Sequence, residues 1–158
     1  MIEIIPNWHP IFVHFTLGLL LTSVALFLVG FLARDKPLGA QATTVARWNL
    51  WIGTAFTLVT VASGYIAYNS VVHDDAGHAA MTLHRWWARG TFVLFVLAAY
   101  LALRERSRVS GAGPLLALVL VAGACTLLVT GYLGAENVYR HGLGVMRVPQ
   151  AEESGHSH

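Results

Sequence analysis

The chain has 158 residues, of which 56% are hydrophobic and only 11% are charged. Soluble domains carry about 25% charged residues, so this composition excludes an ordinary soluble domain. The formal net charge of +2 excludes the strongly basic surface that nucleic-acid binding requires, and we expect no nucleic-acid partner. Cys125 is the single cysteine, so a disulfide within the chain is impossible.

Four long apolar stretches account for the composition. They cover residues 11–33, 48–72, 86–103 and 112–135, and the only charge within them is Arg89. A helix that crosses a bilayer needs about 20 mainly apolar residues, and a soluble core of this size could not hide four of them. We therefore predict an all-α polytopic membrane protein in contact with the lipid bilayer. The expected fold is an up-down bundle of four transmembrane helices at about 10–33, 46–72, 82–104 and 112–136.

The four helices are expected to form one transmembrane domain, residues 1–146, followed by a disordered tail, residues 147–158, that contains two histidines. The first apolar stretch is preceded by a single charge, Glu3. We do not expect a cleaved signal peptide, because a positively charged region and a small-residue cleavage site are both missing around this stretch.

Basic residues indicate how the bundle is oriented in the membrane. The loops around 34–47 and 104–108 hold six Lys and Arg residues, and the opposite side holds four. The positive-inside rule then places these two loops in the cytoplasm and both termini in the periplasm, for a bacterial inner-membrane protein. Tryptophans suited to the aromatic belts of the two interfaces are Trp48 and Trp51 on the cytoplasmic side and Trp8, Trp86 and Trp87 on the outer side.

Histidines are confined to the outer side of this expected topology. The first helix carries one about a turn inside its start, the third helix opens with another, and two lie in the loop between the second and third helices. The eight are His9, His14, His73, His78, His84, His141, His156 and His158.

The sequence also contains an internal repeat. SGYIAYN at 63–69 and TGYLGAEN at 130–137 stand near the outer ends of the second and fourth helices. His14 precedes Gly64 by 50 residues, and His84 precedes Gly131 by 47. Such a repeat predicts two tandem helical hairpins related by a pseudo-two-fold axis along the membrane normal. In that arrangement we expect His14 and His84 to face each other across the axis.

Two histidines on opposing membrane helices are suited to ligating a haem iron from both faces of the ring. We therefore expect a haem b near the periplasmic side, with His14 and His84 as its axial ligands. Small residues on the intervening helices would leave room for the porphyrin, and cations at the same level would bind its propionates. The residues expected in these two roles are Gly64, Gly131, Arg85 and Arg89.

The remaining outer histidines leave two interpretations open. His9 with His141 could ligate a second haem, which gives one or two haems in all. Alternatively, the outer histidines bind copper, iron or zinc, since imidazole suits all three metals. The candidate metal ligands are His9, His14, His73, His78, His84 and His141.

Two segments resemble a widespread bacterial family of uncharacterised four-span membrane proteins. They are HPIFVHF at 9–15 and TGYLGAENVYRHGLGV at 130–145, and the resemblance extends over about residues 8–146. It implies no activity, and Thr16 stands where many relatives have proline. The architecture is also similar to that of four-helix membrane b-type cytochromes. The family pattern marks His9, His14, His84, Glu136, Tyr139, Arg140, His141 and Gly142.

These observations together predict an electron-transfer protein that exchanges electrons with a quinone or a partner redox subunit. A stand-alone enzyme is not expected, because the sequence offers no nucleophile–base pair and no phosphate-binding loop. The alternatives are a transition-metal binding membrane protein, a small transporter and a non-catalytic structural subunit of a membrane complex. Association into an oligomer is left open.

Overall fold

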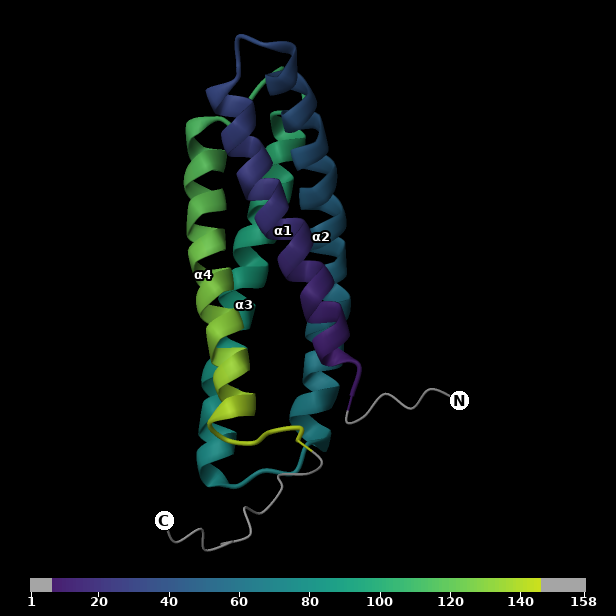
Figure 1. Cartoon of the computed structure of the whole chain (residues 1–158), viewed down its shortest axis with the longest axis vertical. Coiled ribbons are helices and arrows are strands. Elements are labelled where there is room, and N and C mark those ends of the chain that lie inside the picture. The colour runs from purple at the N-terminus through teal and green to yellow at the C-terminus, as the bar shows by residue number, and fades with distance from the viewer. Residues whose placement is uncertain (1–6, 146–158) are drawn as a thin grey trace, which may run out of the picture.

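The computed structural model describes residues 7–145, which form a bundle of four helices (Figure 1). The described part of the chain contains no strand, and each helix is long and apolar enough to cross a membrane. The predicted all-α, four-span fold is therefore confirmed, while the expected tail at 147–158 lies outside the described residues. In chain order the helices are α1 (His9–Leu32), α2 (Pro37–Ser70), α3 (Asp75–Arg104) and α4 (Pro114–Tyr139).

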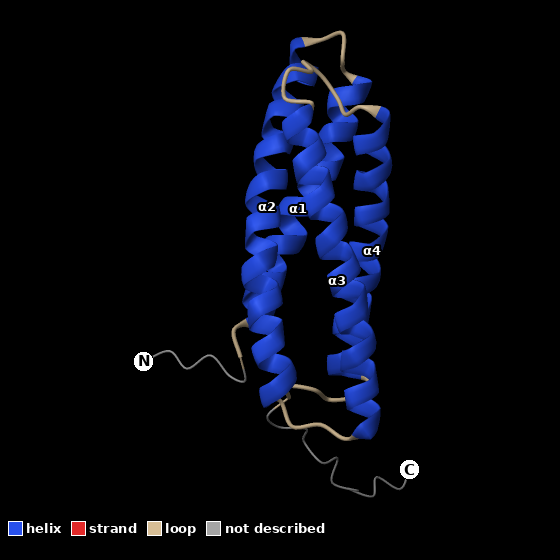
Figure 2. Cartoon of the chain, turned by 180° about the vertical axis from the view of Figure 1, so that it is seen from behind, coloured by secondary structure: helices blue, strands red, loops and turns tan. Residues whose placement is uncertain are grey.

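The helices pack as two hairpins side by side (Figure 2). α1 packs mainly against α2 and α3 mainly against α4, while α2 with α3 and α1 with α4 make smaller contacts. α1 and α3 are therefore diagonal neighbours, as an up-down bundle requires. The loops 33–36 and 105–113 lie at one end of the bundle, here named the two-loop end. The opposite end, where α1 begins and α4 ends, is named the histidine end.

Two helices begin earlier than the apolar stretches suggest. α2 begins at Pro37 rather than near 46, because proline at the first helical position sacrifices no backbone hydrogen bond. α3 begins at Asp75 rather than near 82, because Asp74 caps it by accepting a 2.8 Å hydrogen bond from the backbone N–H of Gly77. His78, which we expected in a loop, therefore lies in the first turns of α3.

The packed core occupies the middle and the two-loop half of the bundle. Leu20, Leu50 and Phe95 are fully buried there. At the two-loop end, the Arg47 guanidinium donates hydrogen bonds to the carbonyl oxygens of Glu105 and Arg108, at 3.0 and 2.7 Å. One side chain of α2 thus fastens the loop between α3 and α4 and joins the two hairpins.

Buried positions reveal the internal repeat, in a register different from the expected one. Four buried residues of α1 recur 75 residues later on α3, and four of α2 recur 70 residues later on α4. A Cβ on Gly53 would press on Leu20, and a Cβ on the equivalent Gly123 would press on Phe95, the equivalent of Leu20. The pairs are Thr16 with Thr91, Leu20 with Phe95, Ser23 with Ala98 and Phe27 with Ala102, then Ala46 with Leu116, Leu50 with Leu120, Gly53 with Gly123 and Thr57 with Leu127.

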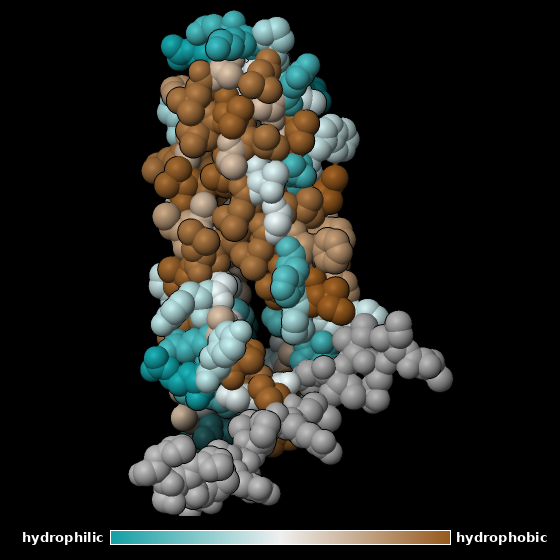
Figure 3. Space-filling view, viewed as in Figure 1, coloured by the Kyte–Doolittle hydropathy of each residue, from teal (hydrophilic) through white to brown (hydrophobic). Residues whose placement is uncertain are grey.

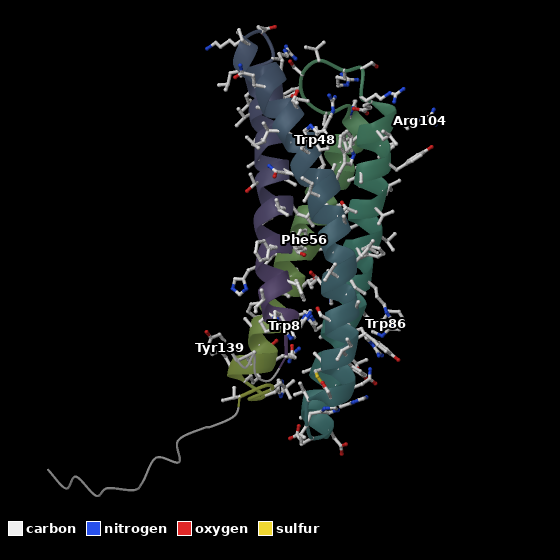
Figure 4. All side chains as sticks on the ribbon, turned by 90° about the vertical axis from the view of Figure 1, so that its right-hand side faces the viewer. Trp8, Trp48, Phe56, Trp86, Arg104 and Tyr139 are labelled. Carbon is white, nitrogen blue, oxygen red and sulfur yellow. The ribbon has the colours of Figure 1, made fainter. Side chains whose placement is uncertain are left out.

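The surface has the pattern of a membrane-spanning bundle. A broad apolar belt separates two polar ends (Figure 3). Aromatic side chains lie at both edges of this belt, with Trp48 toward the two-loop end and Trp8 and Trp86 toward the histidine end (Figure 4). Amphipathic rings are enriched at these two depths because they bridge the apolar and polar parts of a bilayer.

Candidate functional site

His9 opens α1 and lies against α2. Its Nδ1 is 3.0 Å from the backbone oxygen of Thr60 and 3.3 Å from the hydroxyl of Ser63. A carbonyl oxygen only accepts hydrogen bonds, so in the neutral ring Nδ1 carries the proton and Nε2 keeps its lone pair. The contact therefore defines both the orientation and the tautomer of this histidine.

His84 lies against α4 in the same way. Its Nδ1 is 3.1 Å from the backbone oxygen of Thr130, so it also donates there and leaves Nε2 with a lone pair. A glycine one turn further along the neighbouring helix gives each ring access to its carbonyl. A Cβ on Gly64 would stand 2.8 Å from Cε1 of His9, and a Cβ on Gly134 would stand 3.3 Å from Cε1 of His84.

The same two threonines make a second repeated contact, one layer deeper in the bundle. The hydroxyl groups of Thr16 and Thr60 are 2.8 Å apart, and those of Thr91 and Thr130 are 3.0 Å apart. Each hairpin thus carries the same polar unit of a histidine, two threonines and a glycine. We name these the two His-Thr units: His9, Thr16, Thr60 and Gly64, and His84, Thr91, Thr130 and Gly134.

The two His-Thr units belong to diagonal helices of the bundle. His9 on α1 and His84 on α3 are both half-buried. Toward the histidine end the two hairpins diverge (Figures 1 and 2), and the space-filling surface is hollowed between α4 and the α1–α2 hairpin (Figure 3). Two histidines with matched tautomers therefore lie on diagonal helices, near the end of the bundle at which the hairpins diverge.

His14 does not belong to this arrangement. Its side chain is exposed on the outer face of α1, and its Nδ1 hydrogen-bonds the backbone oxygen of Pro10 in the same helix. The expectation that His14 faces His84 is therefore wrong, and His9 holds that position. The physical reason is helical geometry, since five residues rotate a side chain by about 140° around the axis.

Of the other residues expected near a cofactor, Arg85 is half-buried, whereas Gly131 does not adjoin His84 and Arg89 is exposed. A Cβ on Gly131 would have Leu17 as its nearest neighbour, at 3.8 Å, so Gly134 rather than Gly131 adjoins His84. The Arg85 guanidinium stacks 4.2 Å from the ring centre of Tyr68 and is half-buried. Arg89 is exposed and lies 4.8 Å from the ring centre of Trp86.

His73 and His78 form a directed chain of hydrogen bonds near the start of α3. His73 donates from Nδ1 to the Val71 oxygen at 2.6 Å, so its Nε2 accepts from Nδ1 of His78 at 3.1 Å. The Tyr68 hydroxyl then donates to Nε2 of His78 at 3.1 Å and accepts from Thr82 at 3.1 Å. In this neutral chain every imidazole lone pair is engaged.

His141 and its neighbours close the histidine end. Gly142 has a φ of +62°, a conformation that suits glycine, and its N–H bonds back to the Val138 oxygen at 3.0 Å. His141 is half-buried in this turn, and Arg140 pairs with Glu136 at 2.9 Å. Within residues 7–145, no group of three or more His, Cys, Asp or Glu side chains could hold a metal ion.

The fold and this paired polar layer define a four-span membrane protein built from two repeated hairpins. The chain belongs to the family described as "Predicted membrane protein (DUF2231)", which it matches over residues 6–147. The resemblance seen in the sequence is therefore confirmed. No match was found among the curated proteins or among the solved structures.

Sequence reasoning named Thr130 and Gly134 only as small residues that leave room for a porphyrin, and Thr60 only as a polar group within its span; it did not predict that these three residues position the two rings. Their signal is present in the chain, because a threonine follows each of His9 and His84 by seven residues. A second threonine precedes each of Gly64 and Gly134 by four. The Ser/Thr-Gly-Tyr match obscured this spacing by aligning the second and fourth helices three residues out of register.

Proposed function

We propose that this protein is a membrane b-type cytochrome in which Nε2 of His9 and Nε2 of His84 ligate one haem iron between the two hairpins. One observation carries the proposal: both rings donate Nδ1–H to a backbone carbonyl and keep Nε2 unprotonated. Histidines that ligate metals almost always donate their other ring N–H in this manner, which orients the ring and raises its basicity.

The residues around the two histidines fit a haem by their chemistry. Gly64 and Gly134 keep side chains away from the rings, and the two hairpins diverge at this end of the bundle (Figure 2). Arg85 is the half-buried cation nearest in sequence to His84, and its Nε has no hydrogen-bond partner among the described residues. It would pair with a propionate, whereas Arg89 faces outward.

A haem, when bound, supplies one-electron transfer at a potential set by its ligands and by burial. The role of the protein is to orient the two rings through Thr60 and Thr130, and to exclude bulk water with the layer of paired threonines. We propose electron exchange with a quinone or a partner redox subunit. The positive-inside count would put this site on the periplasmic side of a bacterial inner membrane.

The alternative of a transition-metal site at His73 and His78 has weaker support. In the neutral chain from Tyr68 to His73 each nitrogen lone pair already accepts a hydrogen bond, so a metal would have to break that chain. One haem is proposed rather than two, because His9 is used in the pair with His84 and is not available to His141.

The proposal is tested by absorption spectra of the protein purified in mild detergent from haem-replete cells, oxidised and then reduced with dithionite. We expect a Soret band with sharp α and β peaks on reduction, and their loss in His9→Ala and in His84→Ala. His14→Ala and His78→Ala are matched controls that should keep the bands. A folded, helical, colourless wild-type protein would overturn the proposal, as would bands that survive in His9→Ala His84→Ala.

A further inference from the structure

A shallow depression lies on the outer face of the α1–α2 hairpin, within the apolar belt. Three of its lining side chains are polar, although this face is turned away from the rest of the bundle. A polar group that meets hydrocarbon without a partner is costly, so these groups require one. The lining residues are His14, Phe15, Gly18, Leu19 and Thr22 of α1 and Asn49 of α2.

We propose that this depression binds the headgroup of a lipid-soluble hydroquinone. Because Nδ1 of His14 donates to the Pro10 oxygen, the neutral ring presents Nε2 outward as a hydrogen-bond acceptor. An acceptor at this position selects a ligand with an O–H group. Thr22 and Asn49 make no side-chain hydrogen bond to any described residue, so both are free to bind a second oxygen of the same ligand.

The depression is long enough for a single ring. His14 and Thr22 are eight residues apart on α1, a rise of about 12 Å along the helix axis, so a six-membered ring with oxygens at opposite positions has room to lie between them. Gly18 lies midway, and a Cβ placed on it would meet no atom within 4 Å, so the floor is open to a flat ring.

The remaining walls and the location suit a ligand that arrives through the bilayer. Phe15, stacked on Phe56 with ring centres 5.4 Å apart, and Leu19 provide apolar surface beside the ring. A second copy of the chain is a less suitable occupant. The polar groups cover only about two turns of α1, whereas a packed transmembrane helix would run along most of its 24 residues.

This inference deepens the proposed function and rests on it for its physiological role, although not for binding. His14 lies five residues from His9 on α1, a rise of about 7.5 Å, and on the other side of the helix. A hydroquinone in the depression would therefore lie close to the proposed iron ligand while remaining in contact with lipid.

The test is equilibrium binding of radiolabelled decyl-ubiquinol to the full chain in lipid nanodiscs under reducing conditions. We expect the affinity to fall about tenfold in His14→Leu and in Asn49→Leu, the loss typical of one hydrogen bond that leaves a polar group unpaired. The di-O-methyl ether of the same hydroquinone, which has no O–H donor, should bind wild type about tenfold more weakly. Tyr100→Phe, in a different depression lined by Trp51, Ala99, Tyr100 and Leu103, is the matched control and should bind as wild type.

Equal binding by wild type and His14→Leu, or equal binding of the ether, would overturn the inference. A second copy in the depression would also overturn it. Such a copy would be detected if Gly18→Cys Cys125→Ser formed disulfide-linked dimers faster than the wild-type chain forms them through Cys125. The binding assay needs no haem, so the two proposals fail separately. A colourless protein that binds hydroquinone through His14 contradicts the proposed function alone, and a haem protein whose His14→Leu variant binds normally contradicts this inference alone.

Discussion

His9 and His84 occupy equivalent positions in the two halves of the chain, 75 residues apart, and make the same contact. Each ring donates Nδ1–H to the carbonyl of a threonine, Thr60 or Thr130, whose hydroxyl pairs with another threonine deeper in the bundle. A duplicated hairpin thus produces two imidazoles with the same tautomer on diagonal helices.

The glycines beside the two rings should differ in their sensitivity to a methyl group. A Cβ on Gly64 would lie 2.8 Å from Cε1 of His9, and one on Gly134 would lie 3.3 Å from Cε1 of His84. We expect Gly64→Ala to lower the free energy of unfolding by about 1 kcal/mol, the low end for overpacking, and Gly134→Ala to have a smaller effect. Denaturation by SDS titration measures both.

The control for these two variants is Gly18→Ala on the outer face of α1. A Cβ there meets no atom within 4 Å, and alanine is the better helix former, so the variant should be as stable as wild type or more stable. An equal loss in all three variants would show that the rings do not rest on Gly64 and Gly134.

Substitutions of Arg85 and Arg89, four residues apart, should differ in their effects on stability and on the haem potential. Arg85→Gln removes a guanidinium that stacks 4.2 Å from the ring centre of Tyr68, a contact worth about 1 kcal/mol. It also removes the proposed partner of a propionate, so the midpoint potential of the haem should fall. The exposed Arg89→Gln loses a weaker contact, 4.8 Å from the ring centre of Trp86, so its stability should fall less and the midpoint potential should stay near wild type. Redox titration and SDS titration measure them, and an equal effect of the two variants would contradict the assigned difference.

Arg47 should be important for the stability of the two-loop end. It donates to the carbonyl oxygens of Glu105 and Arg108, and Arg47→Ala leaves these groups without their charged donor. We expect a loss of about 2 kcal/mol, typical of hydrogen bonds to a charged group, and faster amide hydrogen exchange in 105–113. The exposed Lys36→Ala is the control. Unchanged exchange in that loop would show that Arg47 does not fasten it.

The orientation in the membrane can be tested with single cysteines in a Cys125→Ser background. Ser70 at the histidine end and Ser107 at the two-loop end are both exposed. If the positive-inside count sets the orientation, a membrane-impermeant maleimide should label Ser70→Cys in intact cells. It should label Ser107→Cys only after permeabilisation. The reverse pattern would put the histidine end in the cytoplasm.

The register of the repeat could not be predicted correctly from the sequence. The Ser/Thr-Gly-Tyr match correctly indicated two hairpins but paired Gly64 with Gly131, whereas the buried positions pair Gly64 with Gly134. A shift of three residues keeps a side chain on nearly the same face of a helix. Similar residues on one helix face therefore fit both registers. The packing of Leu20 on Gly53 and of Phe95 on Gly123 distinguishes them.

By itself the sequence determined the membrane-spanning class and the number of helices, because these depend on the length and hydropathy of continuous segments. The repeated Ser/Thr-Gly-Tyr motif also indicated the duplicated hairpin. The sequence also determined that histidines gather at one end of the bundle. Which histidine turns inward was decided only by the tertiary structure. His9 and His14 begin the same helix, and the choice depends on the rotation at which α1 packs against α2. That rotation follows from contacts between residues more than 40 apart, such as Thr16 with Thr60, which local patterns do not encode.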